Sequence, residues 1–537
     1  MAYAHHWEAL QARAQEFENP EKHLKHLIAQ PERLADFSLN AAGLFYDFSR
    51  QRIDLQTLAQ LYTLAGETGA HDRFRSMLQG VAVNRSENRA ALHTACRDLS
   101  PEPILVNGSD VKSDLHNVNR QVARFTDDVH AGRLTGTTGR PFRHVVVIGI
   151  GGSYLGTQFI AHALHHRANK GLQLHFLSNV DSHNFGEIAA KIDPEATLWI
   201  VISKSYTTAE TLANTRQAYA FMESRRLDPA RHVVTVTSKG SPGDDPENPV
   251  LATFHMFDYI GGRYSVTSAV GGVPLSLCLG PDCFAELLEG AARMDRHAGQ
   301  APAEQNLPLT AALLDVWNTT FLAYPALAIV PYAAPLDKLA PHIQQLSMES
   351  NGKSVTWDGI PHAGESGGFI FGEPGTNAQH SFFQMAHQGR PLPVEFIGIL
   401  NSAYPQVQST SKGVSNHQEL WANLLAQADA LAVGKTTDDP ARSFPGNRPS
   451  TTIVMSDLSP HNLGALLAFY EARTVYAAFI WGINPFDQFG VELGKRTASG
   501  LRAAMAAQNA GDNGYAEDLH PIQAFYLDML FKGKIPG

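Results

Sequence analysis

Apolar residues recur at helical spacing along the first hundred residues of the chain. Trp7, Leu10 and Ala14 follow a three-and-four spacing, and leucines repeat every third residue over 58–64. This pattern is typical of amphipathic helices. We therefore expect a helical N-terminal segment over 1–105. No motif with evident chemistry falls in this part.

From residue 144 onward the pattern changes to short apolar runs of strand length, each followed by a helical stretch. The runs are nearly continuous and rich in β-branched residues, without polar alternation. They therefore predict strands buried on both faces, as in a parallel sheet covered by helices. The first series lies at 144–150, 172–177, 197–202 and 232–236, and the second at 325–330, 368–371, 393–397 and 450–454.

A candidate linker over 301–309 separates the two series. The chain is therefore predicted to be α/β, with two tandem three-layer α/β/α domains built by right-handed crossovers. Ligands of such sheets bind at the carboxyl ends of the strands. The expected domains are 1–105 (helical segment), 106–290 (first α/β domain), 291–510 (second α/β domain) and 511–537 (helical tail).

Composition narrows the class of protein. The chain has 537 residues, 44% hydrophobic and 18% charged, with a net charge of −10, which is typical of a globular protein of two or three domains. The negative balance argues against a nucleic-acid partner. Cys96, Cys278 and Cys283 form no C-x-x-C pair, and the N-terminus lacks the apolar run of a signal peptide. We expect a cytoplasmic protein with no membrane span.

A glycine-rich turn follows the clearest predicted strand. The segment 149–156, GIGGSYLG, includes Gly152 and Ser153 and precedes a helix-like stretch, so its backbone N–H groups could bind an anion. A dinucleotide fingerprint would need glycine where Tyr154 stands, although Asp181 lies at a tolerable distance for a ribose contact. An anion site, a dinucleotide site and a turn that binds nothing all stay open here.

The segment 203–211, SKSYTTAET, places several hydroxyls and an ammonium at the start of a predicted helix. These are the donors that a phosphate monoester requires, and the helix dipole supports them. The alternative is that Thr208 only caps the helix, with Thr207 and Glu210 completing a capping pattern. A cap uses one hydroxyl and leaves the others unexplained. The candidate phosphate ligands are Ser203, Lys204, Ser205 and Thr208.

Two further segments carry groups suited to proton transfer and charge stabilisation. Arg263 follows two glycines and could stabilise a developing oxyanion, or form only a surface salt bridge. Over 341–352 the pattern predicts a helix that ends at Asn351 and Gly352, with Gln345 and Glu349 four apart on one face. Glu349, in the last turn beside an apolar stripe, is a candidate general base. An ordinary solvated glutamate is the alternative.

His380 lies in a turn-rich segment after a predicted strand, where an imidazole could transfer protons. An incidental position is the alternative, because the chain has 24 histidines. His162, His165 and His166 have helical spacing but no H-E-x-x-H motif or supporting acid, so we predict no metal site.

The segment 484–495 begins with Asn484 as a predicted N-cap and proline at the first helical position. A helix from there would align Gln488, Glu492 and Lys495 on one face. An ion pair between Glu492 and Lys495 that serves only structure is the alternative.

Together these segments resemble the glucose-6-phosphate isomerase (phosphoglucose isomerase) family. The resemblance rests on eight segments in chain order: 47–50, 84–93, 150–153, 203–208, 261–264, 348–353, 372–380 and 490–495. It implies two sugar-isomerase (SIS) domains, a homodimer, and no metal or organic cofactor. It also implies reversible isomerisation of glucose 6-phosphate and fructose 6-phosphate, by ring opening and proton transfer through a cis-enediolate.

The resemblance also implies a role for each candidate residue. Glu349 would carry the proton between C1 and C2, and Arg263 would stabilise the charge of the intermediate. His380, contributed by the partner subunit, and Lys495 would open the ring. Ser203, Lys204, Ser205 and Thr208 would hold the phosphate, Gly152 and Ser153 would contact the sugar, and Gln345 and Gln488 would line the pocket.

Two rival functions stay open on the sequence. A non-catalytic sugar-phosphate sensor could keep the hydroxyl cluster of 203–208, but it would not need Glu349, His380 and Lys495 together. An NAD-dependent dehydrogenase is disfavoured by Tyr154. Ser205 and Thr267 depart mildly from the family pattern, and neither change removes a proposed chemical group.

Overall fold

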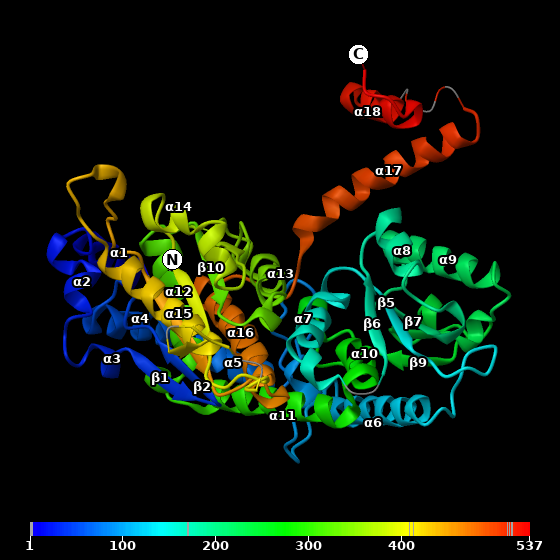
Figure 1. The fold of residues 1–537 in the computed structure, drawn as a ribbon, viewed down its shortest axis with the longest axis horizontal. Helices are drawn as coiled ribbons and strands as arrows, with labels where there is room; N and C mark the ends of the chain where they lie inside the picture. Colours follow the sequence, from blue (N-terminus) through cyan, green and yellow to red (C-terminus); the bar gives the residue numbers. More distant parts are fainter. Residues whose placement is uncertain are drawn as a thin grey trace. The chain divides into compact units, whose positions relative to one another are not determined.

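The computed structural model describes residues 4–168, 171–362, 364–406, 409–411, 413–512, 514, 516 and 519–536 (Figure 1). The chain divides into two units, Met1–Phe486 and Asp487–Gly537. The first unit contains two large sheets, and the second contains the helices α17 (Glu492–Asn509) and α18 (Pro521–Lys532).

The first sheet is wholly parallel and has the order β6-β5-β7-β8-β9. Four of its strands confirm the first series of apolar runs. The fifth strand, β9, was not predicted because its short segment ATFH carries little apolar signal. The strands are β5 (His144–Ile148), β6 (Gln173–Leu177), β7 (Thr197–Ile202), β8 (Val233–Thr237) and β9 (Ala252–His255).

Both faces of this sheet are covered by helices, which explains the lack of polar alternation in its strands. On β5, Val146 and Ile148 belong to one apolar cluster, together with Phe185 of α8 (Ser182–Ala189) and Met222 of α9 (Ala209–Glu223). The alternate residues of β5 belong to the main core on the other face. That face is covered by α6 (Val111–His130), α7 (Leu155–Ala163) and α10 (Ala269–Leu279).

The second sheet has the order β1-β2-β15-β12-β10-β11, and its last four strands are parallel. These four confirm the second series of apolar runs. The strands are β1 (Ser38–Ala41), β2 (Leu44–Asp47), β10 (Ala326–Pro331), β11 (Phe369–Phe371), β12 (Val394–Ile399) and β15 (Ser450–Met455).

The expectation of a wholly helical N-terminal segment is wrong over 38–47. The hairpin of β1 and β2 turns at Ala42 and Gly43, both with positive φ (51° and 87°), and β2 pairs antiparallel with β15. Each strand has four residues, which is too short for a strand period to stand out against the surrounding helical pattern.

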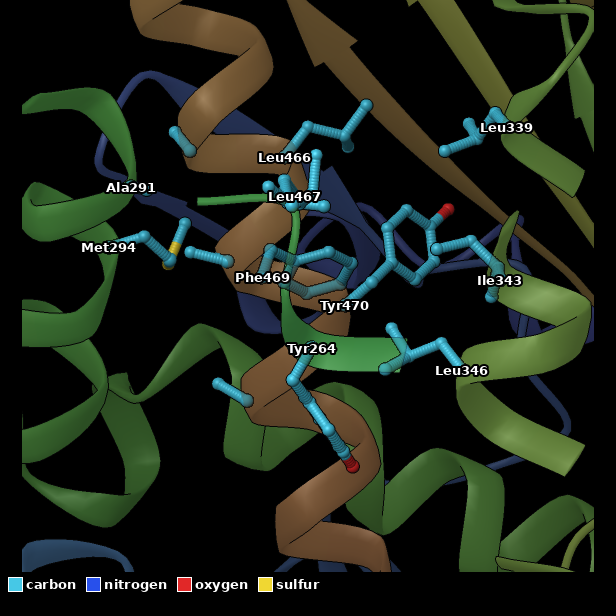
Figure 2. Close-up of a cluster of buried hydrophobic side chains, with 14 of the residues drawn as sticks. Tyr264, Ala291, Met294, Leu339, Ile343, Leu346, Leu466, Leu467, Phe469 and Tyr470 are labelled. Atoms are coloured by element: carbon cyan, nitrogen blue, oxygen red, sulfur yellow. The ribbon is translucent and has the colours of Figure 1, made fainter. Parts of the chain in front are cut away.

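The core of the first unit is built around α16 (Pro460–Trp481). This helix is long and apolar enough to cross a membrane, but every residue of it except His461 is buried inside the protein, as expected of a core helix. It packs closely on α11 (Pro281–Gln300): a Cβ added at Gly464 would lie 2.0 Å from the carbonyl oxygen of Leu287. Figure 2 shows Phe469 and Tyr470 of α16 near Ile343 and Leu346 of α13 (Leu339–Asn351).

The remaining elements surround these layers. The helices are α1 (Ala4–Glu16), α2 (Leu24–Leu27), α3 (Arg33–Asp36), α4 (Leu55–Glu67), α5 (Ala70–Leu78), α12 (Leu307–Val316), α14 (Phe383–Gln388) and α15 (Asn416–Val433). The short ladders are β3 (Leu105–Val106) with β4 (Ser109–Asp110), and β13 (Thr410–Ser411) with β14 (Val414–Ser415).

Candidate active site

The helix α13 presents the proposed base on the face that does not enter the core. Leu339, Ile343 and Leu346 are buried in the main apolar cluster (Figure 2). Gln345 and Glu349 lie four residues apart, and Gln345 Nε2 donates to Glu349 Oε1 at 3.2 Å. The helix ends at Asn351, as predicted, so the carboxylate lies in its last turn.

Arg263 lies beside this carboxylate and is buried. It forms part of the 3₁₀ turn Gly262–Tyr264, and its side chain is only 2% exposed. Its Nη1 donates to Glu349 Oε2 at 3.2 Å, while Nη2 donates to the carbonyl oxygen of Pro485 at 2.6 Å. The surface salt bridge considered for Arg263 is therefore wrong. Glu349, with a 29% exposed side chain in contact with a buried guanidinium, is not an ordinary solvated glutamate.

The glycine-rich turn meets the arginine turn at van der Waals distance. Gly151–Ser153 form a 3₁₀ turn before α7. A Cβ added at Gly152 would lie 2.2 Å from the carbonyl carbon of Gly262, and one at Gly151, where φ is +57°, would lie 2.9 Å from Gln345 Nε2. Three segments predicted separately, namely this turn, the Arg263 turn and α13, thus meet at one place.

Lys204 follows β7 and is held by backbone oxygens. Its Nζ donates to the carbonyl oxygen of Asp258 at 2.9 Å and lies 3.4 Å from a carboxylate oxygen of the same residue. Burial, assisted by the charge of Arg89, lowers the pKa of Lys204. A partly desolvated ammonium of this kind gains more from a phosphate anion than one fully in water.

The hydroxyls of the same loop are not used up by capping. Thr208 occupies the N-cap position of α9, but its side chain makes no capping hydrogen bond to the helix. The hydroxyl oxygens of Ser205 and Thr207 lie 2.6 Å apart in an exposed position. Ser203 is buried, and its Oγ accepts from the backbone N–H of Tyr206 at 3.1 Å. The capping alternative therefore does not account for the cluster.

His380 is placed differently from the groups above. It ends the 3₁₀ turn Asn377–His380 that follows β11, and it is exposed. Within the described part of the chain, no hydrogen bond joins it to Glu349 or Arg263.

The predicted helix starting at Asn484 is wrong. The helix α17 begins at Glu492, so Gln488 precedes it with φ −155° and does not share a helix face with Glu492 and Lys495. Asn484 Oδ1 does accept from the N–H of Phe486 at 3.1 Å, but this bond closes a turn without a helix, as asparagine side chains often do. Gln488 and Lys495 belong to the second unit.

Several groups that surround the candidate base were not predicted from the sequence. Ser350 Oγ accepts from Arg263 Nε at 2.7 Å and lies 2.9 Å from the hydroxyl of Tyr264. Lys353 Nζ donates to the carbonyl oxygen of Glu349 at 2.7 Å. The contacts of Ser350 with Arg263 and Tyr264 depend on how the two α/β domains meet, which no local pattern reveals. Among the described residues, no group of three or more His, Cys, Asp or Glu side chains is placed to hold a metal ion.

Two parallel-rich α/β domains, a loop of hydroxyls and an ammonium, and a carboxylate beside a buried arginine define the class of isomerases that act on phosphorylated sugars. Residues 47–516 match the family described as phosphoglucose isomerase. The chain belongs to this family.

Individual relatives agree with this family along nearly the whole chain. A glucose-6-phosphate isomerase of Desulfosudis oleivorans is 61% identical over 98% of this chain and 97% of the relative. A rice relative, named a cytosolic glucose-6-phosphate isomerase, is 43% identical over 93% of this chain and 91% of the relative. The crystal structure of a glucose-6-phosphate isomerase from Chlamydia trachomatis has a TM-score of 0.90 at 36% identity, covering 98% of this chain and 99% of that one.

These matches confirm the predicted family, the α/β fold class and the predicted activity of an aldose–ketose isomerase. They exclude the two alternative functions, an NAD-dependent dehydrogenase and a non-catalytic sugar-phosphate sensor.

Proposed function

We propose that this glucose-6-phosphate isomerase moves the proton between C1 and C2 of its substrate with Glu349 as the base. The carboxylate takes the proton from C2 of the open-chain aldose and returns it to C1, which converts glucose 6-phosphate into fructose 6-phosphate. The contact of Glu349 Oε2 with Arg263 Nη1 at 3.2 Å carries the proposal. It supports a site where a base and a fixed positive charge face the same substrate atoms.

Arg263 is suited to stabilise the enediolate that forms when the proton leaves C2. Negative charge then develops on the oxygens of C1 and C2, and a buried guanidinium that is already fixed needs no reorganisation to meet it. The bonds of Arg263 to Ser350 and Pro485 support this role, because they hold the guanidinium in one orientation.

The substrate's phosphate is proposed to bind the loop after β7 and the start of α9. Lys204 supplies a charge there, and Ser203, Ser205 and Thr208 supply hydroxyls. The side chain of Thr208 makes no capping hydrogen bond to α9, which supports a role of its hydroxyl in binding the phosphate. Gly152, Ser153, Gln345 and Gln488 are proposed to contact the sugar.

Ring opening is proposed to need a second copy of the chain. His380 is exposed, which leaves its imidazole accessible to a neighbouring subunit. The helix α18 supports a homodimer, because Ile522, Phe525, Tyr526 and Leu530 are spaced along one face and are 52–62% exposed. In that dimer, His380 of one copy and Lys495 would exchange protons with the ring oxygen and the anomeric hydroxyl of the substrate. The dimer is proposed to work in the cytoplasm.

The variant Glu349→Gln tests the proposed base. Conversion of fructose 6-phosphate is followed through a dehydrogenase that consumes glucose 6-phosphate. We expect kcat to fall about 10²–10⁴-fold, since an amide cannot accept the proton, while Glu304→Gln on an exposed segment serves as the matched control. Full turnover by Glu349→Gln would refute the assignment.

Complementation tests whether His380 acts across the interface. Glu349→Gln and His380→Ala are each expected to be nearly inactive, and the two chains are then refolded together. Random pairing makes half of the dimers mixed, and each mixed dimer contains one complete site, so about a quarter of the wild-type activity is expected. If His380 served its own chain, the mixture would stay inactive.

A further inference from the structure

Ser350 connects the helix of the proposed base to the guanidinium beside it. The side chain directly follows Glu349 in α13 and is fully buried. Its Oγ accepts from Arg263 Nε at 2.7 Å, and the hydroxyl of Tyr264 lies 2.9 Å from the same oxygen. Adjacent residues on a helix point about 100° apart. Ser350 therefore binds the guanidinium at Nε, whereas Glu349 contacts it at Nη1.

We propose that Ser350 is a positioning residue for the isomerase reaction, which sets the orientation of Arg263 relative to Glu349. Nε is engaged by Ser350, and Nη2 is engaged by the carbonyl oxygen of Pro485. These two bonds fix the plane of the guanidinium and leave Nη1 directed at Glu349 Oε2. The inference rests on the role proposed for Arg263.

The contact joins parts of the chain that are far apart in sequence. Arg263 follows the first sheet, whereas α13 lies between β10 and β11 of the second. Ser350 therefore fixes Arg263, which belongs to the first α/β domain, to the helical turn of the second domain that carries Glu349. A small shift between the domains then moves the base and the guanidinium together.

Tyr264 completes this arrangement from the other side of the serine. Its ring is buried and stacks on His93, with ring centroids 4.6 Å apart, and it contacts the ring of Phe486 in a tilted arrangement, with centroids 5.8 Å apart. Burial raises the pKa of Tyr264 to about 12, so its hydroxyl keeps its proton and remains a hydrogen-bond donor. Ser350 thus lies between a fixed phenol and a fixed guanidinium and has little freedom to rotate.

The test compares Ser350→Ala with Ser276→Ala, a serine equally buried in α10 but away from the site. Arg263→Ala is the reference for the role of the guanidinium. Both kcat and KM for fructose 6-phosphate are measured. So are the inhibition constants of two phosphorylated probes: a hydroxamate, which has a planar anionic head like the enediolate, and glucitol 6-phosphate, which is uncharged at C1 and C2.

A hydrogen bond to a charged group is lost in Ser350→Ala, so we expect kcat to fall about 10- to 100-fold with KM nearly unchanged. The inhibition constant of the hydroxamate should rise by a similar factor, and that of glucitol 6-phosphate should stay the same. Ser276→Ala should match wild type in every measurement. Tyr264→Phe, which keeps the ring, should change kcat and hydroxamate binding in the same direction, and it replaces Ser350→Ala if that variant fails to fold.

Two results would overturn the inference while leaving the role of Arg263 intact. In one, Arg263→Ala loses activity but Ser350→Ala keeps the wild-type kcat. In the other, binding of both probes weakens equally in Ser350→Ala, as a general loss of packing would produce. Full activity of Arg263→Ala would instead refute the proposed role of the guanidinium itself, and the positioning role with it.

Discussion

Replacing Gly152 by alanine would separate the two turns that form the floor of the site. The added Cβ would lie 2.2 Å from the carbonyl carbon of Gly262, 2.3 Å from its oxygen and 2.7 Å from the nitrogen of Arg263. These are backbone atoms, so no side-chain rotation relieves the overlap. Relief to a normal contact of about 3.4 Å requires the two turns to move apart by roughly 1 Å.

The displaced turn carries Arg263, so the shift reaches the guanidinium. A misplacement of about 1 Å at a reacting group lowers the rate by about 10²-fold, and the overpacking lowers stability by about 1–3 kcal/mol. We therefore expect kcat/KM of Gly152→Ala to fall about 100-fold, measured with fructose 6-phosphate, together with a lower melting temperature.

Gly186→Ala provides the matched control. Gly186 lies inside α8, a helix that covers the first sheet, and a Cβ added there meets nothing within 4 Å. Alanine also has the higher helix propensity, so this variant should keep its activity and gain a little stability. Wild-type kcat/KM and melting temperature in Gly152→Ala would refute the proposed contact between the two turns.

Three further outcomes follow from charged and buried groups. Lys204→Met should raise KM for fructose 6-phosphate about 10- to 100-fold, because a charge-assisted contact to the phosphate is lost, and inorganic phosphate should inhibit this variant more weakly in the same assay. Burial lowers the pKa of His342 to about 4, so the unfolded chain binds a proton that the folded chain does not. Stability is then lost as pH falls from about 6.5 towards 4, by about 2 kcal/mol at pH 5, and urea unfolding of His342→Leu should lack this part. Arg97→Met leaves the buried carboxylates of Asp295 and Glu471, which lie 2.6 Å from the guanidinium, without their counter-charge. Urea unfolding should show a loss of about 3–5 kcal/mol.

The parallel strands were predictable because they are buried on both faces, so nearly every residue in them is apolar and the runs stand out in the sequence. The continuous apolar run at β5 is the clearest case, since alternate residues enter two different clusters. The hairpin of β1 and β2 was not predictable in this way, because its strands have only four residues each and β2 joins the sheet by pairing with the distant strand β15.

The site residues were recognised by their motifs, but their partners were not. Glu349 and Arg263 each stand out in a local pattern, whereas the bond between Arg263 and Ser350 exists only because two domains meet. The predicted helix at Asn484 failed for a related reason. Its side chain also donates to Asn84 and Ser86, and these tertiary bonds favour a turn where local preference favours a helix cap.

The most direct test of the proposed mechanism follows hydrogen at C2 of the product. Fructose 6-phosphate is converted in D₂O, and deuterium at C2 of glucose 6-phosphate is measured by NMR for wild type and Glu349→Gln. We expect deuterium to enter C2 with wild type, because the proton that Glu349 holds while the enediolate exists exchanges with solvent. Both conversion and exchange should fall by about 10²–10⁴-fold in the variant. Conversion or exchange at the wild-type rate in Glu349→Gln would contradict a proton carried by Glu349.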